Sequence, residues 1–469
     1  MRTSLPYLPR YFTINAILFY IGILFLVELL LHKLMPLQYV GFGLVEVIFF
    51  FYFTNQLAYR WANVPERVYR RSVFWNAFLI RAIYVVLIYY FYLLNTGKPF
   101  EFYAADSIFY NELGNLISDQ IKSGNFDFVK NSGLALSDLG TPLYYGIVYL
   151  LVFKSILLSR IVTAIFNAWA CVMVYDLAKR NFGEATGRIS GIMMILAPQL
   201  IIYCGLTLKE GFVAFLCVAF VNMGDKVLRN ARVTFWQVVF LILTGGSLFL
   251  FRTVLGLCAV FSLAVSIVMI SGRVSGIQRR IFVFLILVSG IFFLLRTSIK
   301  EEVETLIQNE STNQTSQMEN YATRERGNKL SVYGSKTIFM ALIIPAPFPG
   351  VVNTDQDNIM LINGALYTRN VFAFFVFLAL ILLFKRRMLQ KHILLLSFTG
   401  TYLGVLAMSG FALSERFHVP AIPFLLVLAG YGITNIDRKN KRYFIPYMIL
   451  MVILILGWNW FKLAGRNML

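Results

Sequence analysis

Charged side chains beside long apolar stretches are the part of this sequence that could perform chemistry. Asp106 stands in the segment EFYAADSIFY, between aromatic residues and shortly after an apolar run. Further ionisable side chains hold the same kind of boundary position: Lys209, Glu210, Arg252, Arg369, Arg416 and His418. A polar group at the edge of hydrocarbon is costly to place, so we treat them all as functional candidates.

Several cations near one carboxylate suit an anionic ligand and a reaction beside it. Arg and Lys both bind phosphate well, and a carboxylate can take a proton from a hydroxyl within reach. These residue types therefore favour Asp106 as a base, with Lys209, Arg252 and Arg416 as phosphate ligands.

Each candidate also has a purely structural interpretation. A single cation at a membrane boundary commonly extends its charge toward the lipid phosphates. Glu210 could pair with Lys209 or cap the next helix, and Asp106 could cap a helix that begins at SIFYNELGNLI. The accidental occurrence of all of them at one predicted face is much less frequent than that of any one alone.

The composition is that of a membrane protein. The chain has 469 residues, of which 58% are hydrophobic and 14% charged, and its mean hydropathy is +0.70. Soluble domains are roughly half apolar and about a quarter charged. The net charge of +19 does not indicate a nucleic-acid partner, because most Lys and Arg fall in short loops between apolar runs, as the positive-inside rule describes.

Apolar runs long enough to cross a bilayer, about 20 residues each, occur about 13 times along the chain. They lie near 13–32, 37–57, 78–95, 159–178, 187–205, 210–224, 234–251, 254–272, 281–296, 366–384, 392–411, 417–434 and 443–461. With a cytoplasmic N-terminus, the loops predicted to lie inside are all basic: 60–71, 179–188, 226–232, 273–280, 385–391 and 438–442. The sequence thus predicts an all-α, polytopic protein.

This topology depends on the segment 142–156, which is apolar but short and contains Pro142 and Lys154. Counting it as a span would place every later basic loop outside. We therefore expect an amphipathic helix in the outer interface, within one of two long outer loops, 96–158 and 297–365.

Metal chemistry has little support in the sequence. The four cysteines lie in or beside apolar runs without metal-ligand spacing, which is typical of small buried hydrophobic residues. The three histidines are far apart in the chain. No metal ligand is assigned.

At these residues the chain resembles the GT-C superfamily of membrane glycosyltransferases, and within it the branch of protein mannosyltransferases and lipid A aminoarabinose transferases. The resemblance covers about residues 78–435. It is carried by the order of five segments: AADSIFY, TPLYYGIVYLLVFK, SRIVTAIFNAWACVMVYDLAKRNFG, GIMMILAPQLIIYCGLTLKE and ERFHVPAIPFLLVLAGYGI.

The resemblance implies a GT-C fold with three parts. Residues 1–77 would be a two-helix membrane extension with a basic cytoplasmic loop, 78–435 the catalytic membrane domain, and 436–469 a cytoplasmic loop with the last span. A second acid beside Asp106, common in this branch, is absent, so a divalent cation is the one cofactor left open.

The implied activity is inverting transfer of a sugar from a polyprenyl-phosphate donor to a glycan, lipid or protein acceptor on the extracytoplasmic face, in a bacterial cytoplasmic membrane. Asp106 would act as the base. The implied substrate-binding set is Lys209, Glu210, Arg252, Arg369, Arg416 and His418, with Tyr110, Tyr144 and Tyr145 able to stack on a sugar.

Two other functions remain open from the sequence. A polysaccharide polymerase or ligase would use a diphosphate-linked donor. A transporter of lipid-linked sugars would show repeated halves and broken helices near the midplane. We find no internal repeat, and the unusual charges lie at a predicted edge.

Overall fold

The computed structural model describes residues 7–32, 35–125, 136–230, 233–270, 357–408 and 414–465. Among these residues the regular structure is entirely helical. The predicted span 281–296 and most of the predicted loop 297–365 lie outside the described residues.

Apart from two helices within the predicted outer loop 96–158, the helices before the central gap follow the predicted apolar runs. They are α1 (Arg10–Leu31), α2 (Leu37–Arg60), α3 (Glu66–Thr96), α4 (Ala105–Lys122), α6 (Leu136–Val152), α7 (Ile156–Phe182), α8 (Glu184–Leu196), α9 (Pro198–Cys204), α10 (Glu210–Arg229), α11 (Phe235–Phe251) and α12 (Thr253–Ile270).

The helices after the gap are α16 (Asp357–Leu361), α17 (Asn363–Lys385), the 3₁₀ turn η2 (Leu389–His392), α18 (Ile393–Met408), α19 (Glu415–His418), the 3₁₀ turn η4 (Val419–Ala421), α20 (Ile422–Thr434), α21 (Arg438–Lys441) and α22 (Phe444–Gly465). Each predicted apolar run except 281–296 coincides, over its described residues, with one or more of these elements.

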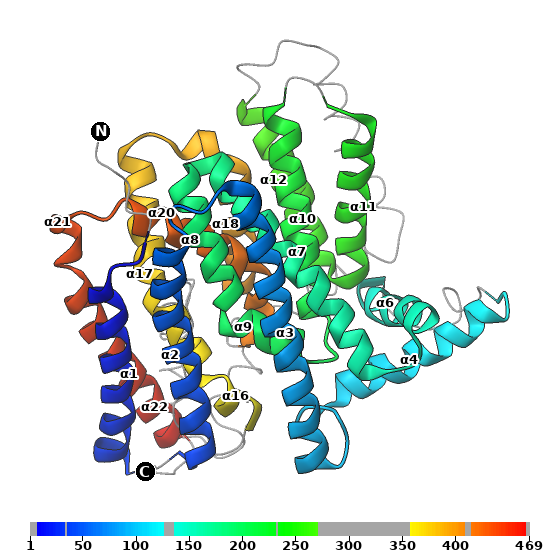
Figure 1. Cartoon of the computed structure of the whole chain (residues 1–469), viewed down its shortest axis with the longest axis horizontal. Helices are drawn as coiled ribbons and strands as arrows, with labels where there is room; N and C mark the ends of the chain where they lie inside the picture. The colour runs from blue at the N-terminus through cyan, green and yellow to red at the C-terminus, as the bar shows by residue number, and fades with distance from the viewer. Residues whose placement is uncertain are drawn as a thin grey trace.

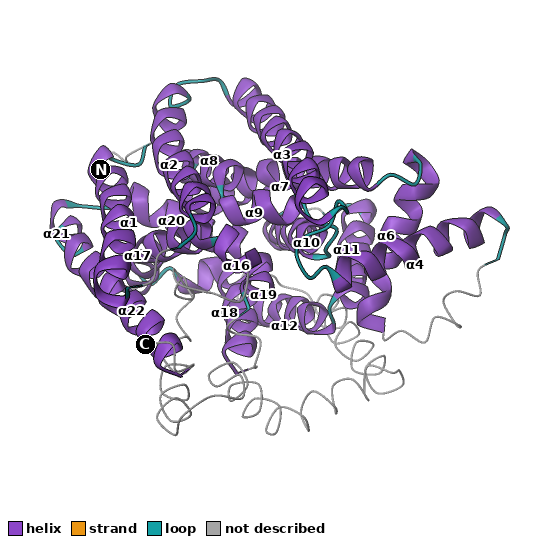
Figure 2. Ribbon diagram, turned by 90° about the horizontal axis from the view of Figure 1, so that it is seen from below, coloured by secondary structure: helices purple, strands orange, loops and turns teal. Residues whose placement is uncertain are grey.

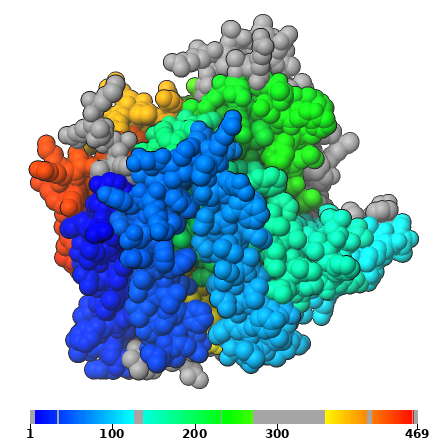
Figure 3. All heavy atoms as spheres, viewed as in Figure 1, coloured from blue at the N-terminus to red at the C-terminus, as the bar shows by residue number. Residues whose placement is uncertain are grey.

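Over the described residues the all-helical class is confirmed, and the helices are compatible with a polytopic membrane protein. The predicted number of about 13 spans is not confirmed. Within the described part of the chain, 8 helices are long and apolar enough to cross a membrane, or 9 if the bent pair α8 and α9 forms one span. Helices α11 and α12 are apolar but shorter. The outward side chains of α1, α2 and α3, such as Phe25, Val45 and Leu87, are exposed and apolar, and these helices form the front face in Figure 3, as expected of a surface in contact with lipid.

The long helices run between two ends of the molecule. Helices α1, α2 and α3 alternate in direction: α1 and α3 run downward in Figure 1, and α2 runs upward. We call the lower end, where α3 ends and α4 begins, the α4 end. The upper end, where α2, α7, α10 and α17 finish, carries the predicted basic loops that the structure describes and is called the basic end. The predicted basic loop 273–280 lies outside the described residues.

Contacts between distant segments bring the basic loops together. The Arg188 guanidinium donates to the carbonyl of Trp61, and Arg70 pairs with Asp176 at 2.7 Å. Similar bonds link the end of α10 to α7 and to η2. Over their described residues, the loops 60–71, 179–188, 226–232 and 385–391, which the charge pattern assigned to one side, therefore do meet at one end.

Helices α4 and α6 lie at the side of this bundle. Helix α6 covers most of the segment predicted as an amphipathic helix, 142–156, and it packs on α4 and α11. Helix α4 projects sideways from the α4 end, as Figures 1 and 2 show. Lys154, just after α6, pairs with Asp119 of α4 at 2.6 Å, so the two helices form one unit.

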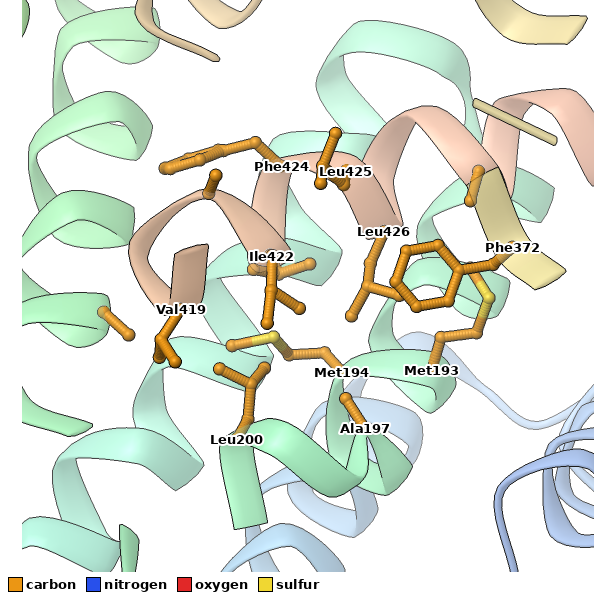
Figure 4. Packing of buried hydrophobic residues seen from close by; sticks show 14 of the residues in the cluster. Met193, Met194, Ala197, Leu200, Phe372, Val419, Ile422, Phe424, Leu425 and Leu426 are labelled. Atoms are coloured by element: carbon orange, nitrogen blue, oxygen red, sulfur yellow. The ribbon is translucent and has the colours of Figure 1, made fainter. Parts of the chain in front are cut away.

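The core lies where α8 and α9 pack against α17 and α20. Met193, Met194 and Leu200 point toward Phe372 and Ile422 in Figure 4, and all five are buried. The turn that precedes α20 is thereby fixed to the rest of the bundle, and this turn carries the candidate residues of α19.

The first two helices are packed on the same core. Gly43 of α2 and Gly364 of α17 approach so closely that a Cβ at Gly364 would lie 2.4 Å from the Gly43 carbonyl oxygen. Glu46 accepts the backbone N–H of Ala365 at 2.7 Å, which caps the start of α17. The proposed boundary at residue 77 falls inside α3, and α1 and α2 contact α17 and α22.

Candidate functional site

Asp106 lies in the first turn of α4, and its partner is Arg416 of α19. Arg416 Nη1 donates to Asp106 Oδ2 at 2.7 Å; the Arg416 side chain is 34% exposed and that of Asp106 is 45% exposed. The residue before α4 is Ala104, with no side-chain cap. Asp106 is therefore not the N-cap, although a negative charge in the first turn favours the helix.

Arg416 also approaches Glu210, the first residue of α10. Arg416 Nε lies 3.8 Å from Glu210 Oε1, and the same oxygen accepts Arg252 Nη2 at 3.0 Å. Glu210 is buried, and its second oxygen has no hydrogen-bond partner among the described residues. A buried, incompletely satisfied carboxylate is costly.

Arg252 joins α11 to α12 in extended backbone conformation. Its guanidinium lies 4.3 Å from the centre of the Phe417 ring and donates to the hydroxyl of Tyr402 at 3.1 Å. Tyr402 in turn donates to the Phe417 carbonyl at 2.6 Å. The cation, the ring and the hydroxyl together fix the α19 turn beside Glu210.

The resulting charge chain, defined here as the outer network, runs from Asp106 through Arg416 and Glu210 to Arg252. Its members come from α4, α19, the start of α10 and the α11–α12 junction. The sequence predicted each of these residues, and the structure brings them together.

Arg369 and His418 belong to a second, buried cluster with Glu415. Arg369 Nη1 donates to both Glu415 oxygens, at 2.9 and 2.8 Å, and Nη2 lies 3.0 Å from His418 Nδ1. Since Arg has no acceptor, His418 Nδ1 must accept, which leaves the proton of this neutral imidazole on Nε2. The cluster anchors the α19 turn that holds Arg416.

Lys209 is not part of the outer network. Its amine pairs with Asp138 of α6 at 2.9 Å rather than with the neighbouring Glu210. Lys209 thus joins the α9–α10 turn to α6. Asp138 was not predicted, since it lies in a polar stretch with no distinguishing pattern.

Tyr110 is buried one turn after Asp106 on α4. Burial raises the pKa of its hydroxyl, and the negative charges of Asp138, Asp106 and Glu210 raise it further, while Arg416 lowers it. Tyr110 thus experiences the charges of both the outer network and Asp138.

The rings of Tyr144 and Tyr145 pack helices together. Tyr144 stacks on Phe212 with ring centres 4.2 Å apart and shares a hydrogen bond with Thr163. Tyr145 is 1% exposed and lies against Gly114 of α4. In this arrangement both rings hold α6 against its neighbours.

Glu101 and Arg160 are buried near Asp106 and were not among the predicted site residues. Arg160 donates to the Pro99 carbonyl at 2.7 Å and to Thr207, and Ser107 donates to Glu101. Burial raises the pKa of Glu101, opposed by Ser107 and Arg160. Arg160 could have been found as a candidate, because it is a charged residue at the start of the apolar run 159–178.

The arrangement offers an accessible carboxylate, a shared guanidinium and a buried carboxylate within one network. Among the residues that the structure describes, no group of three or more His, Cys, Asp or Glu side chains is placed to hold a metal ion.

Comparison with known proteins gives this chain no family. No family model matches it, and no curated protein matches it either.

Proposed function

We propose that this protein is an inverting membrane glycosyltransferase with a GT-C type architecture. It transfers a sugar from a polyprenyl-phosphate donor to a hydroxyl acceptor at the α4 end, which faces the extracytoplasmic side. The observation that carries the proposal is the pairing of Asp106 with Arg416 at the boundary where α3 meets α4, next to Glu210 and Arg252.

In the proposed reaction the acceptor oxygen attacks the anomeric carbon and forms the new glycosidic bond. The bond from that carbon to the phosphate oxygen breaks, and the electron pair leaves with the polyprenyl phosphate. Asp106 takes the acceptor proton. Because the displacement is single, the anomeric configuration inverts.

The cations have a defined part in this reaction. Negative charge grows on the leaving phosphate, and a fixed guanidinium nearby stabilises it. Arg416 suits this role because it is partly exposed, whereas Arg252 is buried between Glu210 and Tyr402. Donor phosphate would compete with Asp106 for Arg416, which frees the carboxylate as the donor arrives.

The test compares Asp106→Asn with wild type. The amide keeps the size of the side chain but cannot accept a proton, so transfer should fall by about 10²–10⁴-fold, the usual effect of a lost base. Purified protein is given polyprenyl-monophosphate and polyprenyl-diphosphate sugars in parallel, and product is measured along with the unfolding temperature.

Asp119→Asn is the matched control, because Asp119 lies on the same helix and also forms an exposed ion pair. It should retain full transfer. A folded Asp106→Asn protein that transfers sugar at the wild-type rate would remove Asp106 as the base. Use of the diphosphate donor alone would instead identify a polymerase or ligase.

A further inference from the structure

The basic end contains a cavity that the proposed transfer reaction does not use. Its volume is about 500 Å³, within the range of small-molecule sites. It is bounded by the α7–α8 turn, the end of α17, the start of η2 and the end of α20. We call it the basic-end pocket.

The lining of the basic-end pocket carries more cations than anions. Its charged residues are Lys179, Arg180, Arg386 and Lys391, with Glu184 as the acidic member. Lys179 is neutralised by Glu66 and Glu184, at 2.6 and 3.0 Å, and Arg180 by Asp225 at 2.9 Å.

Arg386 and Lys391 differ from the other two cations. Arg386 donates to the neutral groups of Tyr431 and Asn435, each at 2.8 Å. Neither Arg386 nor Lys391 has an acidic partner among the described residues, and both are exposed to solvent. Their charges are therefore available to a bound anion.

The backbone offers a second, independent feature of an anion site. Residues 183–186, which open the 13-residue helix α8, line the pocket. Gly183 has φ +95°, a conformation that glycine adopts readily, and no side chain caps the helix. The unpaired N–H groups of a helix start favour phosphate.

One wall of the pocket is aromatic. The rings of Phe182 and Tyr431 lie 4.6 Å apart between centres, and Arg386 lies over Tyr431. The pocket thus combines two uncompensated cations and a helix start with an apolar surface. We propose that the basic-end pocket binds a phosphate group, presented either by an anionic lipid headgroup or by a soluble phosphate ester.

The test titrates the purified full-length protein in neutral detergent with two probes, phosphatidylglycerol and soluble glycerol phosphate, and follows the unfolding temperature. At least one of the two probes should raise the unfolding temperature. Phosphatidylcholine, which is the control lipid, should not raise it. If only phosphatidylglycerol stabilises the protein, the ligand is a lipid headgroup. If glycerol phosphate stabilises it as well, the phosphate group itself is what the pocket binds.

The variant Arg386→Gln with Lys391→Gln should weaken the apparent affinity for the active probe at least tenfold. The matched control is Arg438→Gln with Lys439→Gln, which removes two exposed cations of α21 outside the pocket lining and should keep the affinity. Equal weakening in both variants, or no stabilisation of wild type by either probe, would overturn the proposal.

Discussion

At the scale of single residues, the outer network depends on pairing between positions far apart in the chain. Asp106 and Arg416 are separated by 310 residues, and Glu210 and Arg252 by 42. Each could be predicted alone, because a charge beside an apolar run is unusual. Their pairing could not be predicted, because a single sequence does not indicate which residues far apart in the chain come into contact.

The same limit explains the residues that sequence analysis missed or misplaced. Glu415 stands beside Arg416 in the sequence but was assigned no role, since nothing in the sequence distinguishes an anchor from a ligand-binding group. Lys209 was expected with Arg252 and Arg416 but pairs with Asp138. Tyr402 and Phe417 are ordinary residues of apolar segments until the fold places them against Arg252.

Arg416 gives the clearest test of donor binding. Arg416→Gln removes the charge, and Arg416→Lys keeps it but loses the planar fork. A lost charged hydrogen bond costs about 1.5–3 kcal/mol, so donor affinity should fall about tenfold or more in Arg416→Gln and less in Arg416→Lys. Binding of polyprenyl-phosphate sugar to purified protein measures this.

Lys154→Gln is the control for Arg416, because Lys154 is also a partly exposed cation in an ion pair beside α4. It should bind donor as wild type does. Unchanged donor affinity in Arg416→Gln would leave Arg416 with only a structural role, as a partner of Asp106.

At the scale of elements, the positions of the helices along the chain were easier to predict than the points where a helix is interrupted. The run 187–205 was expected as one span, and the structure has α8 and α9 bent by 46°. The physical cause is Pro198, which has no N–H for the Met194 carbonyl. The guanidinium of Arg81 on α3 replaces the missing N–H donor, since it donates to the carbonyls of Met194 and Ile195 at 2.9 and 3.2 Å.

Arg81 should therefore stabilise the bent span. Arg81→Met keeps much of the side-chain volume but leaves buried carbonyls unpaired, at a cost of about 1–3 kcal/mol for each. The unfolding temperature in detergent should fall clearly. The control Arg71→Met, at an exposed position of the same helix, should leave it unchanged.

A second change separates this role from general packing. Pro198→Ala restores an N–H at the break, so it should recover part of the stability lost in Arg81→Met. If Arg81→Met unfolds at the wild-type temperature, the guanidinium is not what satisfies the break.

At the scale of the whole molecule, the charge pattern and the contacts describe the same two-ended arrangement. The positive-inside rule separated the loops using only their Lys and Arg content. The fold brings the predicted inner loops together through bonds such as Arg70 to Asp176, and the predicted outer residues together in the outer network. The meeting of the described basic loops at one end was predictable because it follows from the local Lys and Arg content of each loop, whereas the pairing of distant side chains does not.

The orientation of the two ends in the membrane can be measured by labelling single cysteines. Ser123 lies just after α4 and Gln390 lies in η2 at the basic end, and both are exposed. The native cysteines, Cys171, Cys204, Cys217 and Cys258, are buried, so they should react slowly. Ser123→Cys should react with a membrane-impermeant maleimide added to cells whose outer envelope has been permeabilised. Gln390→Cys should react only in inverted membrane vesicles. These substitutions change no charge, so they leave the positive-inside signal intact.

Labelling of Ser123→Cys only in inverted vesicles would place the outer network on the cytoplasmic side. That result would exclude transfer on the extracytoplasmic face.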